Sequence, residues 1–137
     1  MKIRYSTNTM KIFFYWKSKT IDSERFQKVI DEFHFENDKM IFNTLDDLKS
    51  SLRTEMNSEI IVVIFTADKK DLSDVYSLRN FLHDFRLILV LPDLEESTIS
   101  KGFECYPRFV SYINSDFNDV MSVLNKMSKK NISSTIK

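Results

Sequence analysis

The chain has 137 residues, 42% of them hydrophobic, and its 20 basic residues (Lys and Arg) are balanced by 20 acidic ones (Asp and Glu). This length and apolar content predict one globular domain with its own core and exclude an intrinsically disordered chain. The zero net charge gives no general attraction to nucleic acid or to an anionic membrane surface. We therefore expect neither nucleic acid nor a membrane among the partners.

The sequence also limits the compartment and the cofactors. No run approaches the roughly 20 apolar residues of a membrane span, and the start of the chain lacks the apolar core and cleavage site of a signal peptide. Cys105 is the only cysteine, so no internal disulfide forms and we expect a cytoplasmic protein. Gly102 is the only glycine, which excludes glycine-rich phosphate loops. One cysteine and two histidines do not make a four-ligand zinc cluster, so we expect no cofactor and no metal.

Short apolar runs alternate with helix-periodic stretches along the chain. The two clearest runs are IIVVIF (60–65) and LILVL (87–91), which are apolar on both faces, as is typical of strands inside a parallel sheet covered by helices. In chain order, strands are predicted over residues 10–16, 39–42, 60–65, 87–91 and 109–113. Helices, in which apolar residues recur at i, i+3, i+4 and i+7, are predicted over residues 22–33, 72–84, 94–101 and 116–127, with one more that begins after Thr44.

Capping residues support the second and fourth helices. Thr44 is a good N-cap residue, and two aspartates follow it in the positive first turn of the helix. Asp93, with Glu96 three residues later, resembles a capping box at the start of the fourth helix. Gly102 is predicted to be the C′ residue that ends this helix.

This order of elements predicts an α/β fold with a single doubly wound sheet of five parallel strands. The arrangement is a flavodoxin-like (βα)5 with strand order 2-1-3-4-5. One domain is predicted over residues 10–127, with an N-terminal extension over residues 1–9 and a polar C-terminal tail over residues 128–137. In this strand order a ligand site lies at the carboxyl ends of strands one and three, where the winding of the sheet reverses.

Lysines are frequent in the segments that follow strands one and three. A crevice at this place would be rimmed by Lys17, Lys19, Thr66, Asp68, Lys69 and Lys70. Converging ammonium groups would bind an anion, such as a nucleotide, a phosphate or an acidic peptide. The alternative is that these lysines are solvated loop residues, because lysine is usually exposed. A small-molecule or anion sensor is therefore one of the functions that the sequence leaves open.

The same layout resembles a known family. Five βα units of these lengths, a short fourth helix that leads into KGFECYPRFVSYI (101–113), and a closing amphipathic helix resemble the receiver domain of two-component response regulators. The resemblance covers residues 10–127 and consists of layout and hydrophobic pattern. In active receivers, an acidic pair after the first strand holds Mg²⁺ and an aspartate at the end of the third strand accepts the phosphoryl group. A Ser or Thr after strand four and a Lys after strand five complete the site.

These site residues do not occur at the matching positions of this chain. Residues 15–17 replace the acidic pair, and Asp68 lies three residues beyond Phe65. The remaining positions are occupied by Phe65 or Thr66, by Leu91 or Pro92, and by Tyr112 or Ile113. Metal-assisted phosphoryl transfer needs the missing acids. The resemblance therefore implies a pseudo-receiver, which is a signalling and protein-interaction module without catalytic residues and not an enzyme.

Aromatic residues gather around the predicted fourth helix, fifth strand and fifth helix. In receivers this face forms dimers or binds an effector, so the resemblance implies an interface with a protein partner or with a second copy. The predicted interface residues are Phe103, Tyr106, Tyr112 and Phe117. The alternative is that most of them belong to the core, because the fifth strand must bury one face. The neighbouring Cys105 is either a redox thiol or a structural cysteine.

Overall fold

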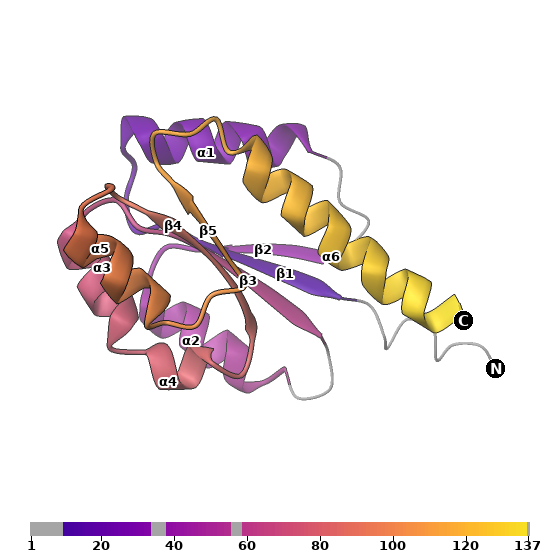
Figure 1. Ribbon diagram of the computed structural model, residues 1–137. Coiled ribbons are helices and arrows are strands. Elements are labelled where there is room, and N and C mark those ends of the chain that lie inside the picture. Colours follow the sequence, from indigo (N-terminus) through magenta and orange to yellow (C-terminus); the bar gives the residue numbers. More distant parts are fainter. Residues whose placement is uncertain (1–9, 34–37, 56–58, 137) are drawn as a thin grey trace.

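The computed structural model describes residues 10–33, 38–55 and 59–136, so the predicted extension over residues 1–9 lies outside the described residues. Five parallel strands form one sheet in the order β2-β1-β3-β4-β5. The strands are β1 (Lys11–Tyr15), β2 (Asp38–Phe42), β3 (Ile60–Phe65), β4 (Arg86–Leu91) and β5 (Phe109–Tyr112). The predicted sheet and strand order are confirmed, and the fold is a flavodoxin-like α/β fold (Figure 1).

Helices cover both faces of the sheet. In the described part of the chain they are α1 (Ile21–Glu32), α2 (Leu45–Arg53), α3 (Lys69–Tyr76), α4 (Arg79–Leu82), α5 (Glu96–Phe103) and α6 (Asn118–Ile136). Figure 1 shows α1 and α6 on one side of the sheet and α2, α3, α4 and α5 on the other. Among the described residues, no helix combines the length and the apolar character that crossing a membrane requires.

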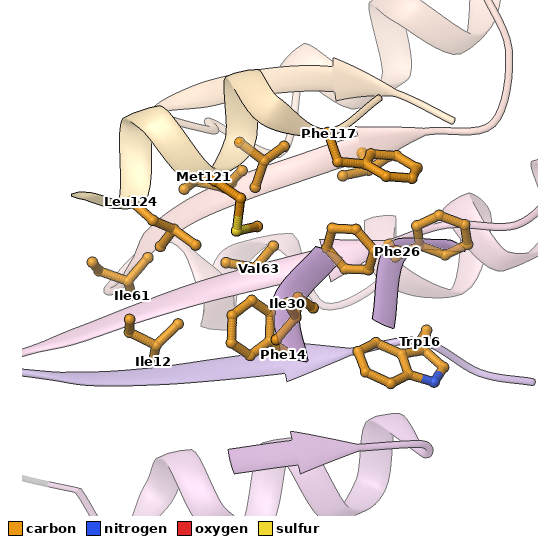
Figure 2. Packing of buried hydrophobic residues seen from close by; sticks show 14 of the residues in the cluster. Ile12, Phe14, Trp16, Phe26, Ile30, Ile61, Val63, Phe117, Met121 and Leu124 are labelled. Carbon is orange, nitrogen blue, oxygen red and sulfur yellow. The ribbon is translucent and has the colours of Figure 1, made fainter. Parts of the chain in front are cut away.

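Aromatic side chains form a core between the sheet and the helices α1 and α6, which we call the aromatic core. Phe26 of α1 stacks on Phe65 of β3 with ring centroids 5.3 Å apart, and it meets Phe117 edge-on at 5.0 Å. Trp16, which follows β1, meets the Phe26 ring edge-on with ring centroids 5.9 Å apart. Figure 2 shows Phe26 lying between Phe117 and Trp16. Rings of this size bury a large apolar area, so this cluster joins α1 and α6 to the sheet.

The other side of the sheet is packed mainly by aliphatic side chains. Alternate residues of a strand point to opposite faces, so Phe14 of β1 faces the aromatic core while Phe13 and Tyr15 face this second cluster. Leu72 and Val75 of α3 are buried against it. The second side also buries the carboxyl group of Asp71, in the first turn of α3.

Burial of the strands falls from the centre of the sheet toward its β2 edge. All six residues of β3 are buried, as expected for a central strand that helices cover on both faces. The strand β2 has β1 as its only neighbour among the described strands, and four of its five residues are exposed. Its fifth residue, Phe42, packs against the second cluster.

The helices predicted over residues 72–84 and 116–127 differ from the observed ones in extent. The helix predicted over residues 72–84 is the pair α3 and α4, and α3 begins earlier because Asp68 caps it. The Asp71 N–H donates to the Asp68 carboxylate at 2.8 Å. Lys69 and Lys70 lie between these two aspartates, so the pattern of apolar residues does not reveal where the helix begins. The last helix, predicted to end at residue 127, continues to Ile136.

The predicted ends of α5 are wrong, whereas the Thr44 cap of α2 is confirmed. Asp93 accepts a hydrogen bond from the Glu95 N–H at 2.9 Å in the turn before α5, and the helix begins without a side-chain cap. Gly102 lies in the last turn of α5 and not after it. A Cβ atom there would stand 2.8 Å from a terminal methyl of Leu91, so the glycine permits close packing of helix on strand.

Candidate functional site

The carboxyl edge of the sheet beside β1 and β2 contains a pocket of about 230 Å³. Its lining residues are Tyr15, Lys17, Asn43, Thr44, Leu45, Asp46 and Asp74. The winding reverses between β1 and β3, which is where ligands bind in doubly wound sheets. Tyr15 of β1 and Asp74 of α3 place the pocket beside this point. Lys17 is exposed and lines the pocket, whereas Lys19 is exposed and is not among the lining residues.

Thr66 is not available to a ligand. Its side chain is fully buried, and its hydroxyl donates to the Val90 carbonyl at 2.6 Å. The Thr66 N–H donates to the same carbonyl at 3.0 Å. Both groups therefore continue the pairing of β3 with β4, and the predicted role of Thr66 at the rim of a crevice is wrong.

The lysines that follow β3 are paired with carboxylates. The Lys69 ammonium contacts the Glu95 carboxylate before α5, and this hydrogen bond raises the pKa of Lys69. The Lys70 ammonium lies 3.7 Å from the Asp74 carboxylate, one helical turn away. Asp68 serves as the N-cap of α3. The predicted rim therefore does not present four unpaired ammonium groups to one anion.

Sequence reasoning missed Asp71, which is buried under the carboxyl edge with 2% of its surface exposed. Its carboxylate accepts the Ala67 N–H at 3.0 Å and lies 3.5 Å from the Tyr15 hydroxyl. Burial raises the pKa of Asp71, opposed by the Ala67 hydrogen bond and reinforced by the neighbouring Asp68. The available signal was the Asp-x-x-Asp spacing at the start of α3, an acidic counterpart of the capping box.

Tyr15 connects this buried carboxyl group to the pocket. Its ring is buried, its hydroxyl contacts Asp71, and it lines the pocket beside Lys17. Burial, followed by the adjacent negative charge of Asp71, raises the pKa of Tyr15. The phenol therefore stays protonated at neutral pH and acts as a hydrogen-bond donor to the carboxyl group.

A larger cavity of about 390 Å³ lies beyond the carboxyl ends of β4 and β5. Its lining residues are Asp22, Arg25, Pro92, Asp93, Leu94, Tyr112, Ile113 and Asn114. The Arg25 guanidinium donates to the carbonyls of Ile113 and Ser115, and it pairs with Asp22 at 3.0 Å. Arg25 therefore ties α1 to the end of β5. No sequence signal reveals this role, because the main partners are backbone carbonyls almost 90 residues away.

The predicted interface residues occupy different environments. Phe103 and Tyr106 are exposed by 55% and 62%, whereas Tyr112 is half-buried beside the 390 Å³ cavity. Phe117 is fully buried between Phe26 and Phe65, so its predicted place in an exposed interface is wrong. It precedes α6 with a left-handed φ of 65°, which turns its ring into the core.

Cys105 has the properties of a structural cysteine. It is fully buried, and burial raises the pKa of its thiol to about 11. A thiol with a raised pKa holds little of the reactive thiolate at neutral pH. The redox alternative is therefore disfavoured at this position.

Together these observations define the class of protein. The chain is a flavodoxin-like α/β domain with a small pocket beside the point where its winding reverses. In the part of the chain that the structure describes, no group of three or more His, Cys, Asp or Glu residues is arranged to hold a metal ion. Comparisons with protein-family models, with curated proteins and with solved structures find no match. A functional proposal for this chain therefore rests on its fold and on the geometry of the site.

Proposed function

We propose that this chain is a receiver-like, non-catalytic signalling module that binds a partner protein. The proposal keeps the resemblance to receivers in layout, and the strand order 2-1-3-4-5 supports it. Phe65 and Leu91 end buried strands where a receiver has its phosphoacceptor and its Ser or Thr. The proposed location is the cytoplasm, whose reducing conditions suit a lone thiol such as Cys105.

The observation that carries the proposal is the state of Tyr106. Its side chain is 62% exposed, and its backbone has a left-handed φ of 57°. This conformation costs an L-residue about 1 kcal/mol or more, and it persists only where the surroundings hold it. The ring lies against His83, at the end of α4, with centroids 4.9 Å apart. A strained backbone that displays a large aromatic ring supports a binding role.

Tyr106 belongs to a surface that we call the α5 surface, formed by Tyr76, His83, Phe103, Glu104 and Tyr106. The Tyr76 hydroxyl donates to the Glu104 carboxylate at 2.7 Å, which links α3 to the end of α5. Arg79 and Lys101 stand over the Tyr76 ring at 4.0 and 5.2 Å. Aromatic rings beside cations suit a partner segment that presents apolar and acidic side chains.

The non-catalytic part of the proposal is tested with a small phosphodonor. The full chain is incubated with acetyl phosphate and Mg²⁺, and its intact mass is measured. We expect an unchanged mass, because Phe65 and Thr66 offer no carboxylate to accept the phosphoryl group. An active receiver treated in parallel shows that the reagents work. A stoichiometric phosphoryl adduct on this chain would overturn the proposal.

The binding part is tested by site-specific photocrosslinking in cells. A benzophenone amino acid replaces Tyr106 in one variant and Lys28, exposed on α1 on the opposite side of the sheet, in the control. We expect a discrete adduct with a partner protein from position 106 and none from position 28. Adding Phe103→Ser to the first variant should remove the adduct. Equal adducts from both positions, or insensitivity to Phe103→Ser, would contradict binding through the α5 surface.

A small-molecule or anion sensor is the second candidate function. The pocket of about 230 Å³ beside Lys17 favours it, because the pocket lies beside the point where the winding reverses. A ligand that binds the folded state raises the melting temperature by mass action. We would measure thermal shifts with nucleotides and phosphorylated metabolites, using Lys17→Ala as the control. Shifts that Lys17→Ala abolishes support this function, and flat curves at millimolar ligand count against it.

A further inference from the structure

The cavity of about 390 Å³ beyond the carboxyl ends of β4 and β5 is formed by three segments of the chain. The turn after β4 and the end of β5 supply most of its lining, and α1 supplies the remainder through Asp22 and Arg25. A dry apolar cavity of about 150 Å³ is large enough to hold benzene. The cavity in this protein is larger than that, so it has room for a ligand of one or two rings.

The positive charge that lines the cavity is already engaged within the protein. The Arg25 guanidinium donates to the Ser115 carbonyl at 2.6 Å and also to the Ile113 carbonyl. It pairs with Asp22 at 3.0 Å, and its central carbon stands over the Phe117 ring, 4.6 Å from the ring centroid. An anionic ligand would have to compete with these contacts for Arg25. The cavity therefore does not suit phosphates or carboxylates.

Asp93 leaves the cavity with an excess of negative charge. Two carboxylates, those of Asp22 and Asp93, line the cavity with one guanidinium, and only Asp22 is paired with it. Asp93 accepts the Glu95 N–H at 2.9 Å and makes no ion pair with another residue that the structure describes. Lys69 acts on the charge of Asp93 from nearby, but its ammonium contacts Glu95 instead. A carboxylate has about four acceptor positions, so Asp93 can still accept hydrogen bonds from the ammonium group of a ligand.

The other side chains of the lining are mainly apolar or aromatic. Pro92 and Ile113 contribute aliphatic surface, and Tyr112 contributes a half-buried ring. Leu94 retains 56% of its surface in contact with solvent, so a ligand that covered it would remove apolar area from water. An aromatic ring such as that of Tyr112 attracts both a second ring and a cation. These walls suit the apolar body of a ligand whose charged end is an ammonium group.

We infer that this cavity binds a small aromatic amine, with the ammonium group on Asp93 and the ring packed against Leu94 and Tyr112. The inference is independent of partner binding, because the cavity shares no residue with the α5 surface. It is also separate from the anion sensor considered for the pocket beside Lys17, because the two cavities share no lining residue.

Three indole compounds of similar shape and different charge test the inference. The ¹⁵N-labelled full chain is titrated at pH 7 with tryptamine, tryptophol and indole-3-acetate, and the amide resonances are followed by NMR. Tryptamine, the cation, should bind with a dissociation constant of millimolar or below and shift the amides of Leu94, Tyr112 and Asn114. Tryptophol, which is neutral, should bind about 10-fold more weakly because it lacks the charged hydrogen bond. Indole-3-acetate, the anion, should not bind.

Butylamine distinguishes a small aromatic ligand from a lysine side chain of another protein, because it reproduces the end of that side chain. We expect butylamine to bind about 10-fold more weakly than tryptamine, since it leaves much of the apolar lining uncovered. Equal binding of the two amines would assign the cavity to lysine side chains and overturn the inference.

Substitutions separate the roles of the charge and of the apolar lining. Asp93→Asn keeps an acceptor for the Glu95 N–H and removes the charge, so it should weaken tryptamine about 10-fold and leave tryptophol unchanged. Leu94→Ser should weaken both compounds, because both rings cover this side chain. Asp31→Asn, at an exposed position in the last turn of α1, is the matched control and should change neither. Circular dichroism confirms that each variant is folded.

The results that would overturn the inference are equally specific. They are an absence of tryptamine binding at millimolar concentration, equal affinities for tryptamine and tryptophol, and tryptamine binding that Asp93→Asn leaves unchanged. Amide shifts that centre on the pocket beside Lys17, and not on the ends of β4 and β5, would also overturn it.

Discussion

The two sides of the sheet are built on different principles, although each contains a cluster of buried residues. On the α1 and α6 side, Phe26, Phe65 and Phe117 pack ring against ring, and no titratable group is part of this cluster among the described residues. On the other side, the buried residues include Asp71 and Cys105. The first side therefore buries mainly apolar area together with hydroxyls such as that of Ser23, whereas the second also buries ionisable groups at a cost.

Two residues with a strained backbone also differ in their surroundings. Phe117 and Tyr106 both have a left-handed φ, at 65° and 57°. At Phe117 the strain is offset by a ring that is fully buried in the aromatic core, whereas the Tyr106 ring remains mostly exposed. The contrast separates a residue held by packing from one whose conformation calls for a functional explanation.

The largest effect is expected from the centre of the aromatic core. Phe26→Ala removes the ring that contacts Trp16, Phe65 and Phe117, so it should lower the free energy of unfolding by about 3–5 kcal/mol. Urea denaturation monitored by circular dichroism measures this change. Lys28→Ala, on the exposed side of the same helix, is the control. A loss below about 1 kcal/mol would show that α1 does not depend on this core.

A smaller loss is expected where α5 packs on β4. Gly102→Ala places a Cβ atom 2.8 Å from one methyl of Leu91 and 3.1 Å from the other. Overpacking of this kind costs about 1–3 kcal/mol, and the better helix propensity of alanine offsets about 1 kcal/mol of it. We expect a net loss of about 1 kcal/mol in urea denaturation.

A second substitution tests the cause. In the Leu91→Ala background the clash is gone, so Gly102→Ala should become neutral or stabilising. If Gly102→Ala costs the same in both backgrounds, contact with Leu91 does not explain the glycine.

The buried carboxyl group gives a pH-dependent effect. Because the pKa of Asp71 is raised in the folded state, the folded state binds its proton more tightly than the unfolded state. Stability from this group is therefore present below the unfolded pKa of 3.8 and is lost as pH rises through the folded pKa. Asp71→Asn keeps an acceptor for the Ala67 N–H and removes the charge, so it should raise the melting temperature at pH 7.

The pH profile distinguishes this cause from a general packing effect. The gain from Asp71→Asn should shrink as the pH falls toward 3.8, where the wild-type carboxyl group is protonated. Ser50→Ala, at an exposed position of α2 that does not titrate, should show no such trend. A gain from Asp71→Asn that is the same at all pH values would contradict a buried ionisation penalty.

The strands were predictable because their chemistry is local. β3 and β4 are continuous apolar runs, and the structure places them within one residue of the predicted bounds. The alternation of these runs with amphipathic helices also fixed the strand order, because right-handed crossovers leave few arrangements. Gly102 shows the limit of this reasoning. Its role depends on the approach of Leu91, which no neighbouring residue in the sequence reveals.

The candidate site was less predictable because its geometry depends on long-range partners. The sequence shows the lysines that follow β3, but it does not show that Lys69 pairs with Glu95, which comes from a different loop. Thr66 looked available, although its hydroxyl bonds the neighbouring strand. Asp71 directly follows two lysines in the sequence, which gives no sign that it is buried. Side-chain pairing across the sheet decides which groups a ligand can reach.

The smallest effect is expected at the exposed strained residue. Tyr106→Gly removes the steric cost of the left-handed backbone, which is about 1–2 kcal/mol. The added flexibility of the unfolded chain opposes part of this gain, so the free energy of unfolding should rise by about 0.5–1 kcal/mol. The same substitution at Phe117 should instead be strongly destabilising, because it empties the aromatic core. Urea denaturation of both variants measures the contrast. The crosslink is measured in parallel, with the benzophenone amino acid placed at position 103. If Tyr106→Gly raises stability and also removes this crosslink, the tyrosine serves binding at the expense of stability. A loss of stability at Tyr106 would instead show that its contact with His83 outweighs the backbone strain.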